Sequence, residues 1–333
     1  MSGGLKVLAL FGQLKHSRID NEQTEILASE LSKNGGILYR KEVFFNVLIN
    51  LPYFMLCVIP VWLLIKHIDD FKDIDECDVI VVSGKKMIRF ARHLRHYMFP
   101  DVKIVQIGNP VCKIRQNDIL IRQETSRFIY TGKNTIKVNG LLCGKINNSI
   151  CEEQCMKFNK IKLALGGNDF IGVFVGGNQF GYKLTVANAI KFGNVLNKIS
   201  SNMDIPLLIA TDGTVNDDSI VALKESLTGC KYYFYDKQKN NIESPKVAFM
   251  SWAKYYILCG NMINDQSEYI SQQKPTYIYL TSGNKKRYLY FVVNMLKRGC
   301  IRLISDDTDV LEDFSPSVMN DLNKISEYIK ELL

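Results

Sequence analysis

The 333-residue sequence lacks the signatures of several protein classes. It contains no RNP, zinc-finger or helix-turn-helix motif, and without one a net charge of +8 is too small to indicate nucleic-acid binding. The N-terminus, MSGGLKVLALFG, has too short an apolar run for a signal peptide and is expected to form a first strand. Hydrophobic residues at 47% and charged residues at 23% exclude a disordered or fibrous chain. At about 150 residues per domain, the length predicts two domains.

Cysteine usage indicates a reducing compartment. The nine cysteines are an odd number and are spread through apolar stretches, where cysteine acts as a small hydrophobic residue. Cys151 and Cys155 form a C-x-x-x-C pair, but no second pair follows and the four histidines lie elsewhere in the chain. Because zinc sites need further ligands at characteristic spacing, we expect no metal site. The cysteine usage itself leads us to expect a cytoplasmic protein.

The most apolar part of the chain is the segment Phe44–Ile65, FFNVLINLPYFMLCVIPVWLLI. Its length would suffice for a membrane-spanning helix, which needs about 20 apolar residues. Asn46, Asn50, Pro52 and Pro60 oppose a spanning helix, because amides are costly in hydrocarbon and proline interrupts a helix. Two other interpretations remain, namely a segment buried in the core and a partly exposed apolar patch that rests on a bilayer surface.

A basic helix is expected over Lys85–Tyr97, directly after Ser83-Gly84. Its cations are Lys85, Lys86, Arg89, Arg92 and Arg95. One interpretation is the solvated face of a helix that covers a sheet. The other is attraction to anionic lipid, worth about 1 kcal/mol for each Lys or Arg near the surface. With the apolar segment, the second interpretation predicts peripheral association with the inner face of a membrane.

Apolar strands and helices alternate along both halves of the chain. In the first half the expected strands are Lys6–Phe11, Gly36–Val43, Val79–Val82, Val102–Ile107, Ile119–Ile121 and Thr135–Val138, and a further helix is Asn21–Lys33. In the second half the expected strands are Phe170–Val175, Pro206–Ala210, Lys231–Tyr235, Tyr255–Cys259 and Thr276–Leu280. The helices there are Thr185–Ser200, Asp217–Leu227, Pro245–Trp252, Asp265–Ser271 and Lys286–Arg298, with a last one near Ser317–Leu333. This alternation predicts parallel sheets covered on both faces.

The predicted fold class is α/β, with two Rossmann-like, doubly wound parallel-sheet domains facing a cleft. We place the boundary in the looser stretch Cys151–Asn168, which ends in two glycines. The predicted domains are residues 1–155 and 168–315, followed by a C-terminal helix over 316–333. In such folds ligands bind at the carboxyl ends of the strands.

The sharpest local feature is an apolar strand that runs directly into Gly176, Gly177 and Asn178. Glycine lets backbone N–H groups approach an anion closely, although a tight turn with positive φ is an equally simple explanation. Thr211 ends the next strand among small polar residues. Glu268 follows a later strand, at the expected start of a helix, where a carboxylate can stabilise the helix or accept two ribose hydroxyls.

From about Leu5 to Ser305 the chain resembles the mitochondrial fission family first named for a plant mutant with elongated mitochondria, as a member of bacterial type. The residues that carry the resemblance are Asn21-Glu22-Gln23, Ser83-Gly84-Lys85, Val105-Gln106-Ile107, Pro110, Asp118, Gly176-Gly177, Tyr182, Leu184-Thr185, Thr211, Ser267-Glu268 and Lys274-Pro275-Thr276-Tyr277. Members of this family look like glycosyltransferases of the two-domain GT-B architecture.

The resemblance implies a metal-independent transfer of sugar from a nucleotide sugar, with no cofactor and with an acceptor at the membrane as one option. The implied donor-binding residues are Gly176, Gly177, Asn178, Tyr182, Thr211, Ser267 and Glu268, the glycines approaching the diphosphate and Glu268 the ribose. An inverting reaction also needs a base on the acceptor side, in the first domain. His16 and Asp20 are the candidates, and Glu124 is a weaker one.

Three departures from the family pattern bear on activity. Asp20 stands where the family has a histidine, Asp212-Gly213-Thr214 replace a basic pair, and Asn261-Met262 replace an Asp-Ser pair. A carboxylate at position 212 would repel a diphosphate. These departures leave open a second function, that of a non-catalytic, membrane-peripheral adaptor that recruits a partner protein. A short-chain epimerase is disfavoured, because no glycine-rich dinucleotide loop follows the first strand.

Overall fold

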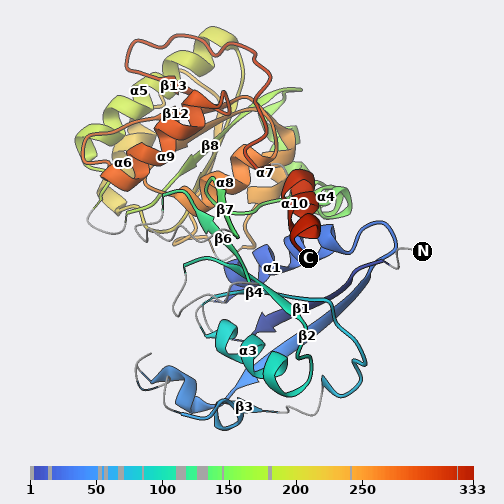
Figure 1. Ribbon diagram of the computed structural model, residues 1–333. Coiled ribbons are helices and arrows are strands. Elements are labelled where there is room, and N and C mark those ends of the chain that lie inside the picture. Colours follow the sequence, from blue (N-terminus) through green and yellow to red (C-terminus); the bar gives the residue numbers. More distant parts are fainter. Residues whose placement is uncertain are drawn as a thin grey trace. The chain divides into compact units, whose positions relative to one another are not determined.

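The computed structural model describes residues 4–13, 17–51, 55, 59–66, 71–84, 86–109, 118–125, 134–144, 146–178, 182–240, 242–320 and 322–333. The chain forms two compact units (Figure 1). Unit 1 comprises Met1–Cys143 and Asn320–Leu333, and unit 2 comprises Gly144–Met319. The division therefore falls upstream of the stretch in which we expected it. The C-terminal helix, expected as a separate element, belongs to unit 1.

The stretch that we expected to be loose contains helix α4 (Asn148–Leu165). The Asn147 side chain caps its first turn by accepting a hydrogen bond from the Ser149 N–H, and Gly166 ends the helix in the left-handed conformation. Of its side chains only Phe158 and Leu165 are buried. Since the helix is exposed on most of its circumference, its sequence has no strong apolar period, and that is why periodicity missed it.

In unit 1 the described residues form a seven-stranded sheet in the order β3-β2-β1-β4-β5-β6-β7. The strands are β1 (Lys6–Gly12), β2 (Ile37–Phe45), β3 (Ile65–Lys66), β4 (Val79–Ser83), β5 (Lys103–Ile107), β6 (Ile119–Gln123) and β7 (Thr135–Val138). All pairings are parallel except that of β2 with β3. The helical elements are α1 (Arg18–Leu31), η1 (Val47–Asn50), η2 (Val61–Leu63), α3 (Met87–Tyr97) and α10 (Leu322–Leu332).

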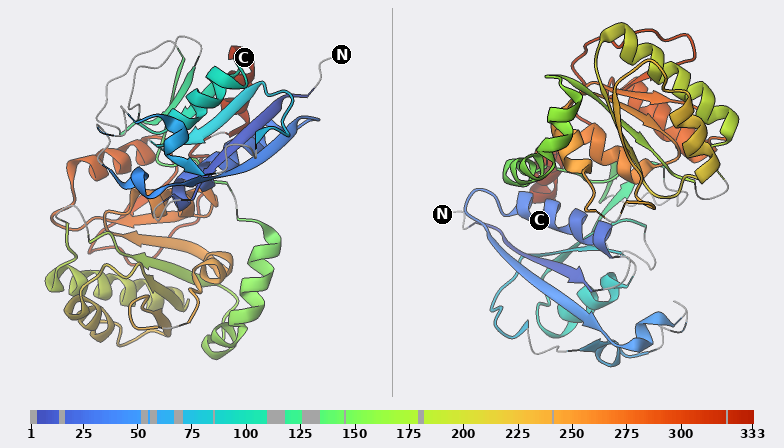
Figure 2. Two further views of the ribbon diagram at one scale, coloured as in Figure 1. Left: turned by 90° about the horizontal axis from the view of Figure 1, so that it is seen from below. Right: turned by 180° about the vertical axis from the view of Figure 1, so that it is seen from behind.

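Helices cover both faces of the unit 1 sheet (Figure 2). Helix α3 and the two short 3-10 turns pack on one face around Leu8, Leu10 and Ile80. Helices α1 and α10 pack on the other face around Val7 and Val81. The two buried layers explain why strands such as β4 are continuous apolar runs, as parallel strands require.

In unit 2 the described residues form a six-stranded parallel sheet in the order β10-β9-β8-β11-β12-β13. The strands are β8 (Phe170–Val175), β9 (Leu207–Thr211), β10 (Tyr232–Tyr235), β11 (Ala253–Cys259), β12 (Thr276–Tyr279) and β13 (Arg302–Ile304). The further helices are α5 (Val186–Met203), α6 (Asp217–Glu225), α7 (Lys246–Trp252), α8 (Ile263–Ser271) and α9 (Lys286–Lys297). Helices α5 and α6 pack on one face of this sheet, and α7, α8 and α9 pack on the other. The predicted fold class, two Rossmann-like α/β units with parallel sheets, is confirmed.

The apolar segment Phe44–Ile65 combines two of the expected interpretations. Ile49, Leu64 and Ile65 are buried in the core of unit 1. Other apolar side chains of the segment are exposed, namely Phe44, Val47, Leu48, Met55, Trp62 and Leu63. Within the described ranges, no helix has the length and apolarity that crossing a membrane requires. The segment is therefore partly core and partly an exposed apolar patch.

The basic helix α3 does not present its cations as a solvated face. Arg95 is buried and forms an ion pair with the buried Asp118. Arg89 is half-buried and donates a hydrogen bond to the Ile59 carbonyl (3.0 Å). Lys86 and Arg92 are half-buried as well. The solvated-face interpretation is wrong for Arg95, whereas Lys86, Arg89 and Arg92 keep part of their surface exposed.

Candidate functional site

The strand order of the unit 2 sheet reverses between β8 and β11, the position at which open α/β sheets bind ligands. The turns that follow these two strands touch each other. The Gly176 N–H donates to the Cys259 carbonyl (3.1 Å). A Cβ added to Gly260 would lie 1.8 Å from the Gly176 carbonyl oxygen. Glycine is therefore required sterically at this contact, whatever the loop binds.

Backbone N–H groups of the glycine loop after β8 donate hydrogen bonds to side chains of the loop after β9. The Gly177 N–H donates to Asp212 Oδ2 (2.7 Å). Asp212 Oδ1 also accepts hydrogen bonds from the backbone N–H (2.8 Å) and the hydroxyl (2.7 Å) of Thr214. The Asn178 N–H donates to Thr214 Oγ1 (2.9 Å). The Asp212 carboxylate therefore occupies the position in front of the Gly177 N–H that a diphosphate oxygen would need.

Two side chains beside this switch point each have a buried polar atom without a partner among the described residues. Gln266, fully buried on α8, donates from Nε2 to the Gly260 carbonyl (3.0 Å) and the Tyr288 hydroxyl (2.9 Å). Its Oε1 has no partner among the described residues. Asn178 accepts the Leu184 N–H at Oδ1 (2.8 Å), and its buried Nδ2 has no such partner either. An unsatisfied acceptor and an unsatisfied donor, each costing about 1–3 kcal/mol, therefore flank the switch point.

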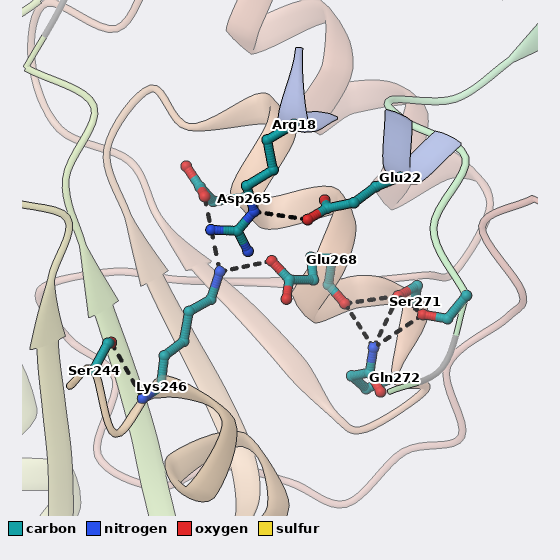
Figure 3. A network of polar contacts seen from close by, with 9 residues as sticks. Arg18, Glu22, Ser244, Lys246, Asp265, Glu268, Ser271 and Gln272 are labelled. Carbon is teal, nitrogen blue, oxygen red and sulfur yellow. Dashed lines mark hydrogen bonds and ion pairs between the residues drawn. The ribbon is translucent and has the colours of Figure 1, made fainter. Parts of the chain in front are cut away.

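Glu268 lies on α8 in a small polar network (Figure 3). Its Oε2 is 2.6 Å from Lys246 Nζ, which also lies 3.8 Å from Asp265 Oδ1 and 4.8 Å from the centre of the Tyr269 ring. Because α8 begins at Ile263, Glu268 is in its second turn, and the expectation that it opens the helix is wrong. The Lys246 ammonium partly neutralises the two carboxylates.

Three other expected donor-site residues are buried and bonded within unit 2. The Tyr182 hydroxyl hydrogen-bonds the Thr281 hydroxyl (2.7 Å), and burial raises the pKa of Tyr182. Thr211 Oγ1 donates to Asp236 Oδ1 (3.3 Å), while the buried Asp236 Oδ2 has no partner among the described residues. Ser267 is fully buried and donates to a carbonyl one turn earlier in α8 (2.6 Å). These three side chains hold the loops in place.

The unit 1 sheet has its own switch point, between β1 and β4, and the start of α1 lies there. The Asn21 side chain accepts the Gly12 N–H (3.0 Å) and donates to the Gly12 carbonyl (3.1 Å). Asp20 Oδ1 accepts a hydrogen bond from Ser83 Oγ (2.8 Å), and a Cβ on Gly84 would lie 2.7 Å from Asp20 Oδ2. Burial raises the pKa of Asp20, and the hydrogen bond from Ser83 opposes that shift.

The other expected bases are less informative. His16 lies outside the described residues. Glu124 follows β6, and its N–H donates to the Val138 carbonyl (2.8 Å). Within the described ranges no group of three or more His, Cys, Asp and Glu side chains could hold a metal ion.

Sequence reasoning missed Gln266 and Lys246. The signal for Gln266 was its place on the apolar stripe of α8, between Ile263 and Ile270, where a polar side chain must be buried. Lys246 had no comparable signal, because 22 residues separate it from Glu268. Only the folded chain brings this ammonium to the carboxylate.

Comparison with known proteins gives a family and a fold. The family model described as "Mitochondrial fission ELM1" matches residues 18–333. An uncharacterized protein of Rickettsia prowazekii (strain Madrid E) is 26% identical over 314 residues, covering 86% of this chain and 88% of the relative. A crystal structure assigned as a UDP-N-acetylglucosamine 2-epimerase, from Listeria monocytogenes, aligns with a TM-score of 0.50 at 10% identity, over 99% of this chain and 88% of that one. The UDP-GlcNAc 2-epimerase from Neisseria meningitidis aligns with a TM-score of 0.48 at 13% identity, over 98% and 91%. The likeness to solved structures shows the fold alone, a GT-B-like pair of Rossmann-like units.

Proposed function

The chain belongs to the mitochondrial fission ELM1 family, and from that premise we propose that it binds a nucleotide sugar in unit 2 and transfers the sugar without a metal ion. The observation that carries the proposal is the pair of unsatisfied atoms at the unit 2 switch point, Gln266 Oε1 and Asn178 Nδ2. A nucleotide base presents both N–H donors and carbonyl acceptors along one edge. A base whose edge reached these two buried atoms would satisfy both, at the place where this sheet type binds ligands.

A nucleotide sugar as the ligand agrees with the Listeria neighbour, which is assigned as a UDP-N-acetylglucosamine 2-epimerase. In this chain Glu268 would accept the ribose hydroxyls, since its Oε1 is not bonded within the described residues. Lys246, at 2.6 Å from the other carboxylate oxygen, would supply positive charge toward the diphosphate. Lys246 would thus supply the positive charge that the basic pair, absent after Thr211, would otherwise supply.

Departure of the nucleoside diphosphate would be assisted by Lys246 and by backbone amides, which stabilise developing negative charge without a metal. Asp20 is our candidate base for the acceptor hydroxyl. Its raised pKa brings the carboxylate closer to the range in which a general base is effective near neutral pH. His16 remains the alternative base. The acceptor would bind to unit 1, and one at a membrane surface agrees with the exposed apolar side chains there.

Calorimetric titration of the full chain with UDP, UDP-sugars and GDP-sugars tests the proposal. We expect one class to bind, and Glu268→Ala to weaken its binding by about 1.5–3 kcal/mol, the scale of hydrogen bonds to a charged group. Glu225→Ala, which removes an exposed carboxylate at the end of α6, is the matched control and should bind as the wild type does. Equal affinity in all three proteins would refute the role of Glu268, and no binding of any nucleotide would refute the function.

A second candidate function is a non-catalytic, membrane-peripheral adaptor that recruits a partner protein. The observation that favours it is the hydrogen bond from Gly177 to Asp212, because an amide already bonded to a carboxylate is not available to a diphosphate. A folded wild-type chain without affinity for any nucleotide sugar would favour this candidate over the first.

A further inference from the structure

A hollow in unit 1 lies where the apolar segment meets helix α3. The hollow is shallow and partly open to solvent, with an enclosed volume of only about 10 Å³. Apolar side chains of β2, β3, α3 and the two 3-10 turns form most of its wall, among them Phe45, Leu64 and Phe90. Two cations complete it, Lys86 at the N-cap of α3 and Arg89 in its first turn. An apolar wall with positive charge on one side is the complement of an anionic amphiphile.

The positive charge of the hollow is not compensated within the described part of the chain. Neither Lys86 nor Arg89 forms an ion pair with a described acidic side chain. Arg89 Nη2 donates to the Ile59 carbonyl (3.0 Å), whereas Arg89 Nη1 is buried and has no partner there. A buried, unsatisfied donor on a charged group is costly, and an anionic oxygen would satisfy it with a charge-assisted hydrogen bond.

The surroundings of the hollow indicate which kind of anion would bind. Ile49 and Val61 line it, and other residues of η1 and η2 have exposed apolar side chains. Val47 is 84% exposed and Trp62 is 60% exposed. A soluble phosphate would leave these side chains in water and would gain nothing from the apolar wall. A lipid in a bilayer would cover both, since exposed apolar side chains beside cations are typical of interfacial binding.

We propose that this hollow binds an anionic membrane lipid, with the head-group phosphate on Arg89 and Lys86 and the first methylenes of an acyl chain against the apolar wall. This inference rests on the peripheral membrane association proposed above, and it is independent of nucleotide binding in unit 2. It deepens that association by naming a site, so that Arg89 and Lys86 should discriminate among lipids and not only strengthen adsorption to any negative surface.

The experiment measures the quenching of Trp62 fluorescence by lipid vesicles. The chain has two tryptophans, so Trp252→Phe leaves Trp62 as the single reporter. Its fluorescence is measured with vesicles of phosphatidylcholine alone or mixed with phosphatidylglycerol, each with brominated acyl chains that quench a tryptophan at the level of the bilayer. We expect quenching only with phosphatidylglycerol, and weaker binding at high salt, because screening shortens the range of attraction.

Variants separate the site from general adsorption. In the Trp252→Phe background, Lys86→Gln with Arg89→Gln should bind the anionic vesicles at least about tenfold more weakly, the scale of a lost charge-assisted hydrogen bond. Lys33→Gln, which removes an exposed cation after α1, is the matched control and should change binding little. If Arg89→Gln does not fold, Arg89→Lys is used instead. This variant keeps the positive charge but loses the paired N–H donors of the guanidinium, so it should bind with intermediate affinity.

Each contrary result has its own meaning. Quenching that Lys33→Gln and the double variant reduce equally would leave the membrane association intact and overturn the lipid site. Binding of inorganic phosphate that depends on Arg89, with no quenching of Trp62, would assign the hollow to a soluble anion and overturn the proposal. Absence of any vesicle binding would overturn both the site and the association. Nucleotide titration of the double variant should match the wild type in every case.

Discussion

At the scale of single residues, Asp212 holds the glycine loop of unit 2 much as a bound anion would. Its Oδ2 accepts the Gly177 N–H at 2.7 Å, and a Cβ on Gly176 would lie 2.1 Å from its Cγ. Backbone N–H groups at glycine-rich turns are common contacts for phosphates, and here a carboxylate of the chain takes that contact. A diphosphate at this loop must therefore compete with Asp212.

Asp212→Ala should consequently strengthen the binding of nucleoside diphosphates by roughly tenfold, because it frees the Gly177 N–H and removes a repelling charge. Calorimetric titration of the variant with UDP and GDP measures the gain. Thr214→Ala is the control, since it removes a hydroxyl from the same cluster and leaves the bond between Asp212 and Gly177 in place. A folded Asp212→Ala protein with unchanged affinity would show that the phosphates do not use this loop.

Asp20 is a half-buried carboxyl whose raised pKa has a consequence for stability. The folded chain binds its proton more tightly than the unfolded chain does, so this group lowers the free energy of unfolding as the pH rises above about 4. Asp20→Asn keeps a side chain that can hydrogen-bond Ser83 and removes the charge. We expect the variant to be more stable than wild type at pH 7 and equally stable below pH 4, as measured by urea unfolding. A stability difference that does not change with pH would refute this role for the carboxylate.

At the scale of secondary structure, a buried ion pair joins helix α3 to the start of strand β6. Arg95 and Asp118 are 8% and 3% exposed in their side chains, so neither charge reaches water. Removing one partner leaves the other charge buried and alone, which typically costs 3–5 kcal/mol, whereas replacing both by apolar residues is often nearly neutral. The pair therefore fixes the position of α3 on the sheet.

We expect Arg95→Met to lower the free energy of unfolding of unit 1 by about 3–5 kcal/mol, and the double variant Arg95→Met, Asp118→Leu to recover most of that loss. Urea unfolding measures both. The exposed pair Arg18–Glu22 on α1 provides the control, because Arg18→Gln should cost less than about 1 kcal/mol. Equal losses in the single and double variants would contradict the account.

The elements that could be predicted from the sequence are those whose burial leaves an apolar pattern. Strands β4, β8 and β9 are buried at every residue, and their apolar runs located them closely. Helix α4 was missed because water surrounds most of it. The glycine loop was found, but its bond to Asp212 was not, because 35 residues separate the partners and no local pattern encodes such a pairing. Asp20 was named, whereas its contact with Ser83, 63 residues away, was not.

At the scale of the whole molecule, unit 1 is completed by the end of the chain. Helix α10 comes after all of unit 2 in the sequence, yet Ile329 is fully buried in the cluster that contains Leu27 and Leu31 of α1. The apolar residues Leu322, Ile325, Ile329 and Leu332 recur at helical spacing, which predicts a packed face. Spacing alone does not say which surface receives that face. For this reason the helix was expected as a separate element.

Ile329→Ala should therefore destabilise unit 1 although position 329 follows unit 2 in the chain. A buried isoleucine replaced by alanine typically costs 2–5 kcal/mol, because methyl groups are lost and a cavity remains. Hydrogen exchange read out by peptide should show faster exchange in β1 and α1 and unchanged exchange in β8 and β9. Tyr328→Ala is the matched control, since Tyr328 is 43% exposed and its loss should leave both units as they are. Faster exchange confined to α10 would mean that unit 1 folds without it, and faster exchange in β8 would mean that the helix stabilises the other unit.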